Sequence, residues 1–138
     1  MKRMKWIAAA GALLVSATAH AQQPVKIGFV AELSGPVGAL GQDMYDAFML
    51  VVERNGGKLG GVPVQILRED SQLKPEVANQ IVDKLIEKDR VPIIAGVTFS
   101  NVMMAVYKKI VDNEVFLIGS NASPSQLAGA QCSPFYFQ

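Results

Sequence analysis

Short apolar runs alternate with longer amphipathic runs along the chain, and this alternation limits the possible folds more than any other feature. The apolar runs are typical of buried strands, and they occupy residues 25–31, 62–70, 92–96, 116–119 and 135–137. Parallel strands need crossover connections, which helices usually supply. We therefore expect an α/β fold: a doubly wound, mainly parallel sheet with helices on both faces. The sheet is expected to be incomplete, because the chain stops in its fifth strand.

Four helices are expected between these strands. The first pattern opens at Gly41 and stops at the Asn-Gly-Gly sequence of residues 55–57. The second has Pro75 in its first turn, where proline is favoured, and carries a continuous apolar stripe. The third runs to residue 113 with Ser100 as its cap, and the fourth begins at Ser123, which a glutamine follows three residues later as in a capping box.

The first 21 residues have the pattern of a secretory signal peptide. Lys2, Arg3 and Lys5 form a positive start, residues 6–15 are uncharged and apolar, and an Ala-His-Ala box follows at residues 19–21. Cleavage there would leave a mature chain that begins at Gln22, and the alternative is an uncleaved N-terminal anchor. We expect export to the periplasm.

Composition narrows the function classes further. The whole sequence has 13 Lys and Arg against 12 Asp and Glu, and loss of residues 1–21 would leave a net charge of −2 and remove the one histidine, His20. A mildly acidic chain is not a default nucleic-acid binder. A chain without histidine has no Ser-His-Asp or Cys-His pair and no imidazole metal site. We expect no enzyme activity, no metal site and no cofactor; Cys132 is either a free thiol or half of a bridge to another segment.

The loops that follow the strands are the expected place for a ligand, because open parallel sheets bind ligands beyond the carboxyl ends of their strands. Residues 98–101 and 120–123 are small and polar and run directly into expected helix starts. Free N–H groups at a helix start suit a carboxylate. We predict a small anionic or zwitterionic ligand at these loops. The alternatives are that Ser100 and Ser123 only cap helices, that Phe99 belongs to the core and that Asn121 is only a turn residue.

A glycine-rich turn follows the first strand. Glycines 35, 38 and 41 have the spacing GxxGxxG, which differs from the GxGxxG of dinucleotide-binding sites. The glycines are better explained as giving backbone freedom to a loop that bends into the cleft, with Leu40 directed at the ligand.

Taken in order, several segments resemble the periplasmic substrate-binding proteins of the branched-chain amino acid ABC transporter family. The resemblance lies in residues 25–36, 41–48, 55–61, 69–72, 75–86, 94–96 and 100–101, after the signal peptide. It implies a two-lobed, hinged receptor that delivers its ligand to a membrane permease. Residues 22–138 would then be the first part of one ligand-binding lobe, with the second lobe missing.

The resemblance also implies roles for individual residues. Leu40 would lie over the ligand, Phe99, Ser100 and Asn101 would bind its carboxylate, and the loop of Asn121, Ala122 and Ser123 would meet its polar end. Leucine-binding members tend to carry a bulky aromatic residue in place of Leu40 and small hydroxyl residues in the 98–101 loop. The sequence of residues 99–102 is closer to a branch that binds aromatic or other hydrophobic carboxylic acids.

The partners implied are a small carboxylate ligand and an ABC permease of the inner membrane, with no nucleic acid, and the full-length protein is expected to be a monomer. Two other functions share this kind of fold. One is the ligand-sensing module of a signalling receptor, and the other is an exported α/β enzyme.

Overall fold

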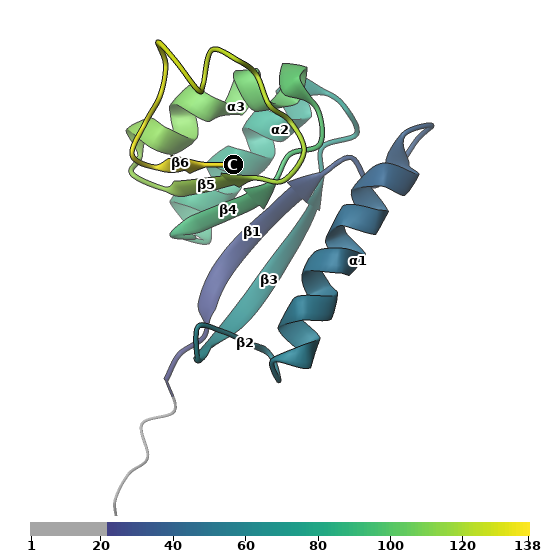
Figure 1. Cartoon of the computed structure of the whole chain (residues 1–138), viewed down its shortest axis with the longest axis vertical. Helices are drawn as coiled ribbons and strands as arrows, with labels where there is room; N and C mark the ends of the chain where they lie inside the picture. The colour runs from purple at the N-terminus through teal and green to yellow at the C-terminus, as the bar shows by residue number, and fades with distance from the viewer. Residues whose placement is uncertain (1–21) are drawn as a thin grey trace, which may run out of the picture.

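The computed structural model describes residues 22–138, so the predicted signal peptide lies outside the described residues. The chain forms a six-stranded sheet with the order β2-β3-β1-β4-β5-β6 (Figure 1). Its strands are β1 (Val25–Ala31), β2 (Lys58–Leu59), β3 (Val62–Asp70), β4 (Ile93–Gly96), β5 (Phe116–Gly119) and β6 (Tyr136–Phe137). The helices are α1 (Gly38–Arg54), α2 (Pro75–Asp83), its π-helical continuation η1 (Lys84–Lys88), and α3 (Ser100–Asp112).

The sheet is parallel except for one short hairpin. Strand β1 pairs in parallel with β3 on one side and with β4 on the other, so that Ile27 lies opposite both Ile66 and Ile93. The sheet continues in parallel through β5 to β6, while β2 pairs antiparallel with β3. The expected mainly parallel sheet is therefore confirmed.

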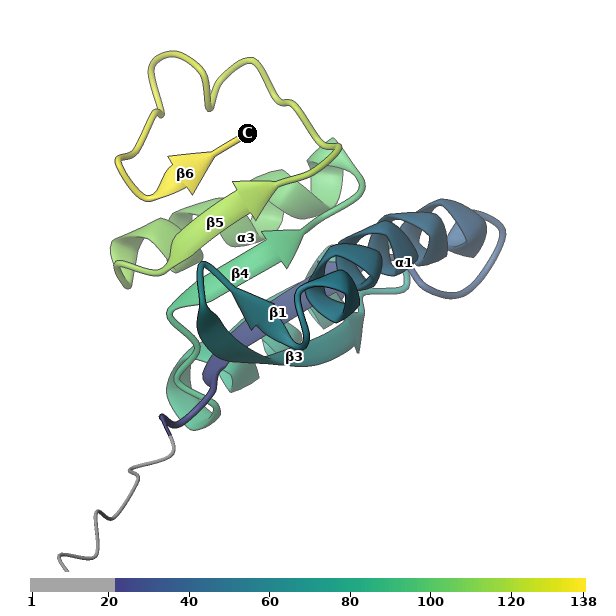
Figure 2. The same ribbon diagram turned by 60° about the horizontal axis from the view of Figure 1, so that its bottom comes forward.

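Helices lie on both faces, as expected for a doubly wound sheet. Helix α1 covers one face over β1 and β3, and α2 and α3 pack side by side on the opposite face (Figures 1 and 2). Strand β1 serves both layers, because successive side chains point to opposite faces. Phe29 packs with the residues of α1, while its neighbour Val30 belongs to the core beneath α2 and α3.

A glycine of β1 makes room for a side chain of η1. A Cβ on Gly28 would lie 2.7 Å from a methyl carbon of Leu85, so this methyl group would have to shift if position 28 carried a side chain. On the face that carries α1, strands β5 and β6 are not covered by a helix. Phe116 and Ile118 of β5 and Phe137 of β6 are 41%, 44% and 54% exposed. Figure 2 shows these strands with no helix in front of them.

Several sequence-based boundaries need correction. Helix α1 begins at Gly38 and not at Gly41, so the expected glycine-rich loop is partly helical. No helix follows Ser123 in the described structure; residues 124–132 form successive turns, held by hydrogen bonds such as Leu127 N–H to Pro124 O (3.0 Å). The capping-box pattern is a local signal, and it was overridden in a segment whose Leu127 is buried in the core.

Candidate ligand-binding site

The carboxyl ends of four adjacent strands meet at one edge of the sheet. In sheet order these are β3, β1, β4 and β5, and the loops that follow them begin at Ser71, Glu32, Val97 and Ser120. From β1 the chain enters α1 on one face, and from β4 it enters α3 on the other. The gap between β1 and β4 is therefore the topological switch point, where open α/β sheets bind their ligands.

The end of β4 has an unusual backbone. Gly96 and Val97 both adopt positive φ angles, of 106° and 59°. A Cβ at position 96 would lie 2.4 Å from the carbonyl oxygen of Val30, so only glycine fits there. A β-branched residue such as Val97 is strained at positive φ. The turn is held by the Val97 N–H, which donates to Val30 O at 2.6 Å.

Just beyond this turn are three of the predicted ligand-binding residues. Phe99 is half-buried, and Ser100 and Asn101 are exposed in the first turn of α3. Phe99 and not Ser100 is the N-cap residue, and within the described structure no side chain caps this helix. The explanation that Ser100 only caps α3 is therefore wrong. Ser100, Asn101 and the first N–H groups of α3 thus follow directly on β4, one of the two strands that flank the switch point.

The loop after β5 is hydrogen-bonded to the turn after β4. Asn121 Nδ2 donates to the carbonyl oxygen of Thr98 at 2.7 Å, and the N–H groups of Ser120 and Ala122 donate to Gly96 O and Val97 O. Asn121 and Ser123 are exposed, but Ala122 is buried in the core. The structure thus brings the two predicted loops together, but the side chain of Ala122, which was predicted to contact the ligand, is buried in the core and its N–H donates to Val97 O.

Leu40 lies in the first turn of α1, where it is 43% exposed, and not in a flexible loop. Its neighbour Gly41 contacts the backbone of Glu32 so closely that a Cβ there would be 2.0 Å from the Glu32 carbonyl oxygen. The start of α1, and with it Leu40, therefore lies directly against the end of β1.

Sequence reasoning assigned no role to Asp70, the last residue of β3. Asp70 accepts hydrogen bonds from the N–H groups of Leu33 and Gln72, both at 2.9 Å. Burial raises the pKa of Asp70, but hydrogen bonds from the Ser34 side chain and from the backbone of Leu33, Gln72 and Ser34 outweigh it and leave this pKa below 3.8. Asp70 therefore joins the end of β3 to the loop after β1, and the only sequence signal for it was an acidic residue at the last position of a strand.

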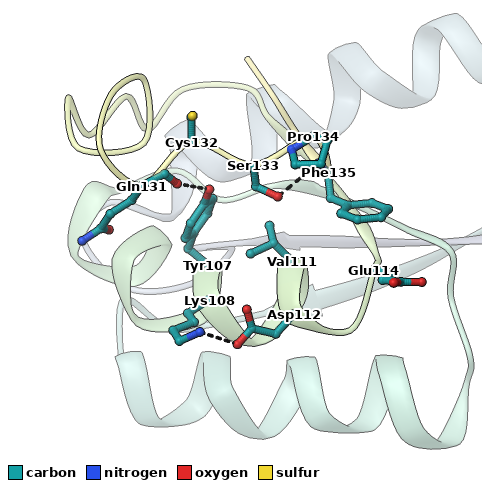
Figure 3. Close-up of a pocket in the computed structure, with 10 residues that line it drawn as sticks. All are labelled: Tyr107, Lys108, Val111, Asp112, Glu114, Gln131, Cys132, Ser133, Pro134 and Phe135. Atoms are coloured by element: carbon teal, nitrogen blue, oxygen red, sulfur yellow. Dashed lines mark hydrogen bonds and ion pairs between the residues drawn. The ribbon is translucent and has the colours of Figure 1, made fainter.

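A larger hollow lies away from these loops. A cavity of about 570 Å³ is lined by the second half of α3, by Glu114 and by residues 131–135 (Figure 3), and Ser100 is not among its lining residues. In it the hydroxyl of Tyr107 donates to the carbonyl oxygen of Gln131, and burial, with a further contribution from Cys132, raises the pKa of Tyr107. A smaller hollow of about 320 Å³ does lie at the strand-end edge, between the loops that contain Pro36 and Leu73.

Residues 22–138 contain neither a candidate metal-binding cluster nor a candidate membrane-spanning helix. No three or more His, Cys, Asp or Glu side chains in this part of the chain are grouped so that they could hold a metal ion. None of its helices has both the length and the apolar character required to span a membrane.

Residues 24–138 match the family described as "Periplasmic binding protein". A curated relative, the Leu/Ile/Val-binding protein homolog 6 of Brucella abortus, is 27% identical over 128 residues, which are 92% of this chain and 33% of the relative.

Solved structures give the same result. The ABC transporter substrate-binding protein from Sphaerobacter thermophilus is 38% identical with a TM-score of 0.79, over 83% of this chain and 32% of that chain. A solute-binding protein of an ABC transporter from R. palustris, in complex with benzoate, is 29% identical with a TM-score of 0.79 over the same shares of the two chains. The present chain thus spans about a third of the length of the relatives that it matches.

Proposed function

This chain belongs to the periplasmic binding protein family, and from that premise we propose that the whole protein is a solute receptor of an ABC importer. It binds a small organic acid without transforming it. The observation that carries the proposal is the hydrogen bond from Asn121, in the polar loop after β5, to Thr98, in the turn that leads from β4 into the uncapped start of α3 beside the switch point.

The carboxylate of the ligand is bound by neutral groups. The first turn of α3 offers N–H donors and the positive end of the helix dipole, and both favour an anion. Ser100 and Asn101 are exposed at this turn, and Asn121 and Ser123 are exposed in the neighbouring loop. Hydroxyl and amide groups add directional hydrogen bonds without introducing a second charge that would need its own partner.

The remainder of the ligand is apolar. Phe99 is half-buried at the entrance to α3 and Leu40 is exposed in the first turn of α1, so that apolar side chains flank the polar groups. The relatives support two ligand classes, because one is named as a Leu/Ile/Val-binding protein homolog and another was solved with benzoate. We propose a hydrophobic carboxylic acid, either a branched-chain amino acid or an aromatic acid, bound in the periplasm.

Residues 22–138 supply one wall of the site. A second lobe closes over the ligand by a hinge motion, driven by contacts that the ligand makes with both lobes. The closed, monomeric receptor then delivers the ligand to a permease in the inner membrane, and no cofactor takes part.

Calorimetry of the whole protein with leucine and with benzoate tests this proposal. We expect one of the two acids to bind, and we expect Ser100→Ala and Asn101→Ala to weaken its binding by about 1–3 kcal/mol each, because each removes a hydrogen bond to a charged group. Asn113→Ala, at the opposite end of α3, is the matched control and should leave affinity unchanged. Wild-type affinity in both test variants would place the ligand elsewhere, and no binding of any small carboxylate would refute the proposal.

A further inference from the structure

Three polar residues are buried within the described structure, and all three begin or continue loops at the strand-end edge. Glu32, Ser71 and Thr98 are each 1% exposed or less. They follow β1, β3 and β4, which are neighbours in the sheet. Buried polar groups are costly unless they are hydrogen-bonded, so their gathering at one edge calls for a physical explanation.

Hydrogen bonds link these residues into a chain that runs across the sheet. Ser71 Oγ donates to Glu32 Oε1 at 3.0 Å, and the Glu32 N–H donates to Thr98 Oγ1 at 3.5 Å. The carbonyl oxygen of Thr98 accepts from Asn121 Nδ2 at 2.7 Å. The chain thus joins the loops after β3, β1, β4 and β5 in the order in which these strands lie in the sheet.

Glu32 is the central member of this chain and touches the most elements. Its side chain bonds the loop after β3, its N–H bonds the turn after β4, and its carbonyl group lies against Gly41 at the start of α1. Its second carboxylate oxygen, Oε2, is buried without a hydrogen-bond partner among residues 22–138.

Stability alone does not explain a buried carboxylate of this kind. Even a complete buried ion pair is often replaced by apolar side chains of similar size without loss of stability, so burial of a carboxyl group is weak evidence for a role in stability. What Glu32 adds is geometry. Its N–H donates to the hydroxyl of Thr98, and Val97, the residue before Thr98, is held in a strained conformation at φ 59°. Such strain persists only where surrounding contacts enforce it. The residues that follow this turn are Phe99, Ser100 and Asn101.

We propose that Glu32 is a positioning residue for the ligand site, a role that rests on the proposed binding of an organic acid. Held by Ser71, it fixes the end of β1 against the hydroxyl of Thr98 and so sets where α3 begins relative to the loop of Asn121. The N–H groups and side chains at the start of α3 then meet the ligand carboxylate in a fixed geometry. Glu32 itself, being fully buried, does not touch the ligand.

Two substitutions in the whole protein separate positioning from stability. Glu32→Met keeps the size of the side chain and removes its hydrogen bond, whereas Glu32→Gln keeps an acceptor for Ser71. We expect Glu32→Met to bind leucine or benzoate at least about 10-fold more weakly, with a fall in melting temperature no larger than that of Val82→Ala, because the substitution leaves only the Ser71 hydroxyl unpaired. We expect Glu32→Gln to stay within about 2-fold of wild-type affinity.

Amide hydrogen exchange gives a second readout that needs no ligand. The N–H groups of Val97 and Ala122 hold the turn after β4 and the loop after β5, by donating to Val30 O and Val97 O. In Glu32→Met both should exchange about 10-fold faster or more, and in Glu32→Gln they should exchange as in the wild type. Val82→Ala, a fully buried position in α2, is the control that lowers the melting temperature but leaves affinity unchanged.

The outcomes are distinct. Unchanged affinity and unchanged exchange in Glu32→Met overturn the proposal, and so does a loss of affinity that Val82→Ala reproduces at the same drop in melting temperature. If the wild type binds neither acid, the proposed function fails, and exchange at Val97 and Ala122 still decides the role of Glu32. Should Glu32→Met not fold, Ser71→Ala removes the same hydrogen bond and must show the faster exchange and the weaker binding.

Discussion

Replacing Gly41 by alanine tests how closely α1 lies against the end of β1. A Cβ at position 41 would stand 2.0 Å from the carbonyl oxygen of Glu32 and 2.7 Å from its carbonyl carbon. Both are backbone atoms, so no rotation of a side chain relieves the clash. The start of α1 would have to move away from the strand by about 1 Å, and Leu40 would move with it.

Two opposing contributions set the size of the effect. Glycine within a helix is less favourable than alanine by about 0.5–1 kcal/mol, so in open space the substitution would stabilise α1. Overpacking costs about 1–3 kcal/mol, and the upper end applies here because the contact is with backbone. We expect Gly41→Ala to lower the free energy of unfolding by about 2 kcal/mol.

Urea unfolding followed by circular dichroism measures this change. With a urea dependence of about 1–3 kcal/mol per molar, the midpoint should fall by about 1 M. Gly129→Ala is the matched control, because a Cβ there would have Ser125 O as its nearest neighbour at 3.7 Å, an ordinary contact. A Gly41→Ala midpoint equal to or above that of the wild type would show that helix propensity dominates, and would refute the close contact between α1 and Glu32.

Three further predictions concern helix ends, acid stability and the end of β4. Helices α1 and α3 end in the same hydrogen-bonded motif, with Gly56 (φ 62°) and Glu114 (φ 57°) as the left-handed residues, so Glu114→Gly should stabilise the chain by about 1 kcal/mol and Gly56→Ala should destabilise it by a similar amount. Urea midpoints that shift in the same direction in both variants would contradict this. Because the pKa of Asp70 is lower in the folded chain, its stabilisation is present above pH 3.8 and is lost as the pH falls through the folded pKa. Asp70→Asn should therefore flatten the acid limb of stability measured by urea unfolding at a series of pH values, and parallel curves for the two proteins would count against it. Gly96→Ala should cost more than about 2 kcal/mol, since its φ is 106° and its Cβ would lie 2.4 Å from a backbone oxygen; wild-type thermal stability would argue against this turn.

Features that depend on a few neighbouring residues were predictable from the sequence. Pro75 begins α2, and α1 ends at the Asn-Gly-Gly sequence of residues 55–57. Strands β1, β4 and β5 lie within one residue of the predicted apolar runs. The predicted helix after Ser123 was wrong because its capping-box signal is local, whereas the burial of Leu127 against the sheet is not.

Part of the candidate site was predictable for the same reason. Polar residues directly after apolar runs placed Ser100, Asn101 and Asn121 in loops at the carboxyl ends of strands. The hydrogen bond from Asn121 to Thr98, which joins two of these loops, depends on β4 and β5 lying side by side. Whether Ser100 and Asn101 bind a ligand stays a prediction.

By itself, then, the sequence determined the alternation of strands and helices, the parallel class of the sheet and the edge at which polar loops gather, because backbone geometry gives strands and helices different side-chain periods. Only the tertiary structure decided that Glu32 is buried beside Ser71, a residue 39 positions away, and that Gly41 touches the strand end. These contacts depend on strand order and on the distance between packed elements, and periodicity along the chain carries information about neither.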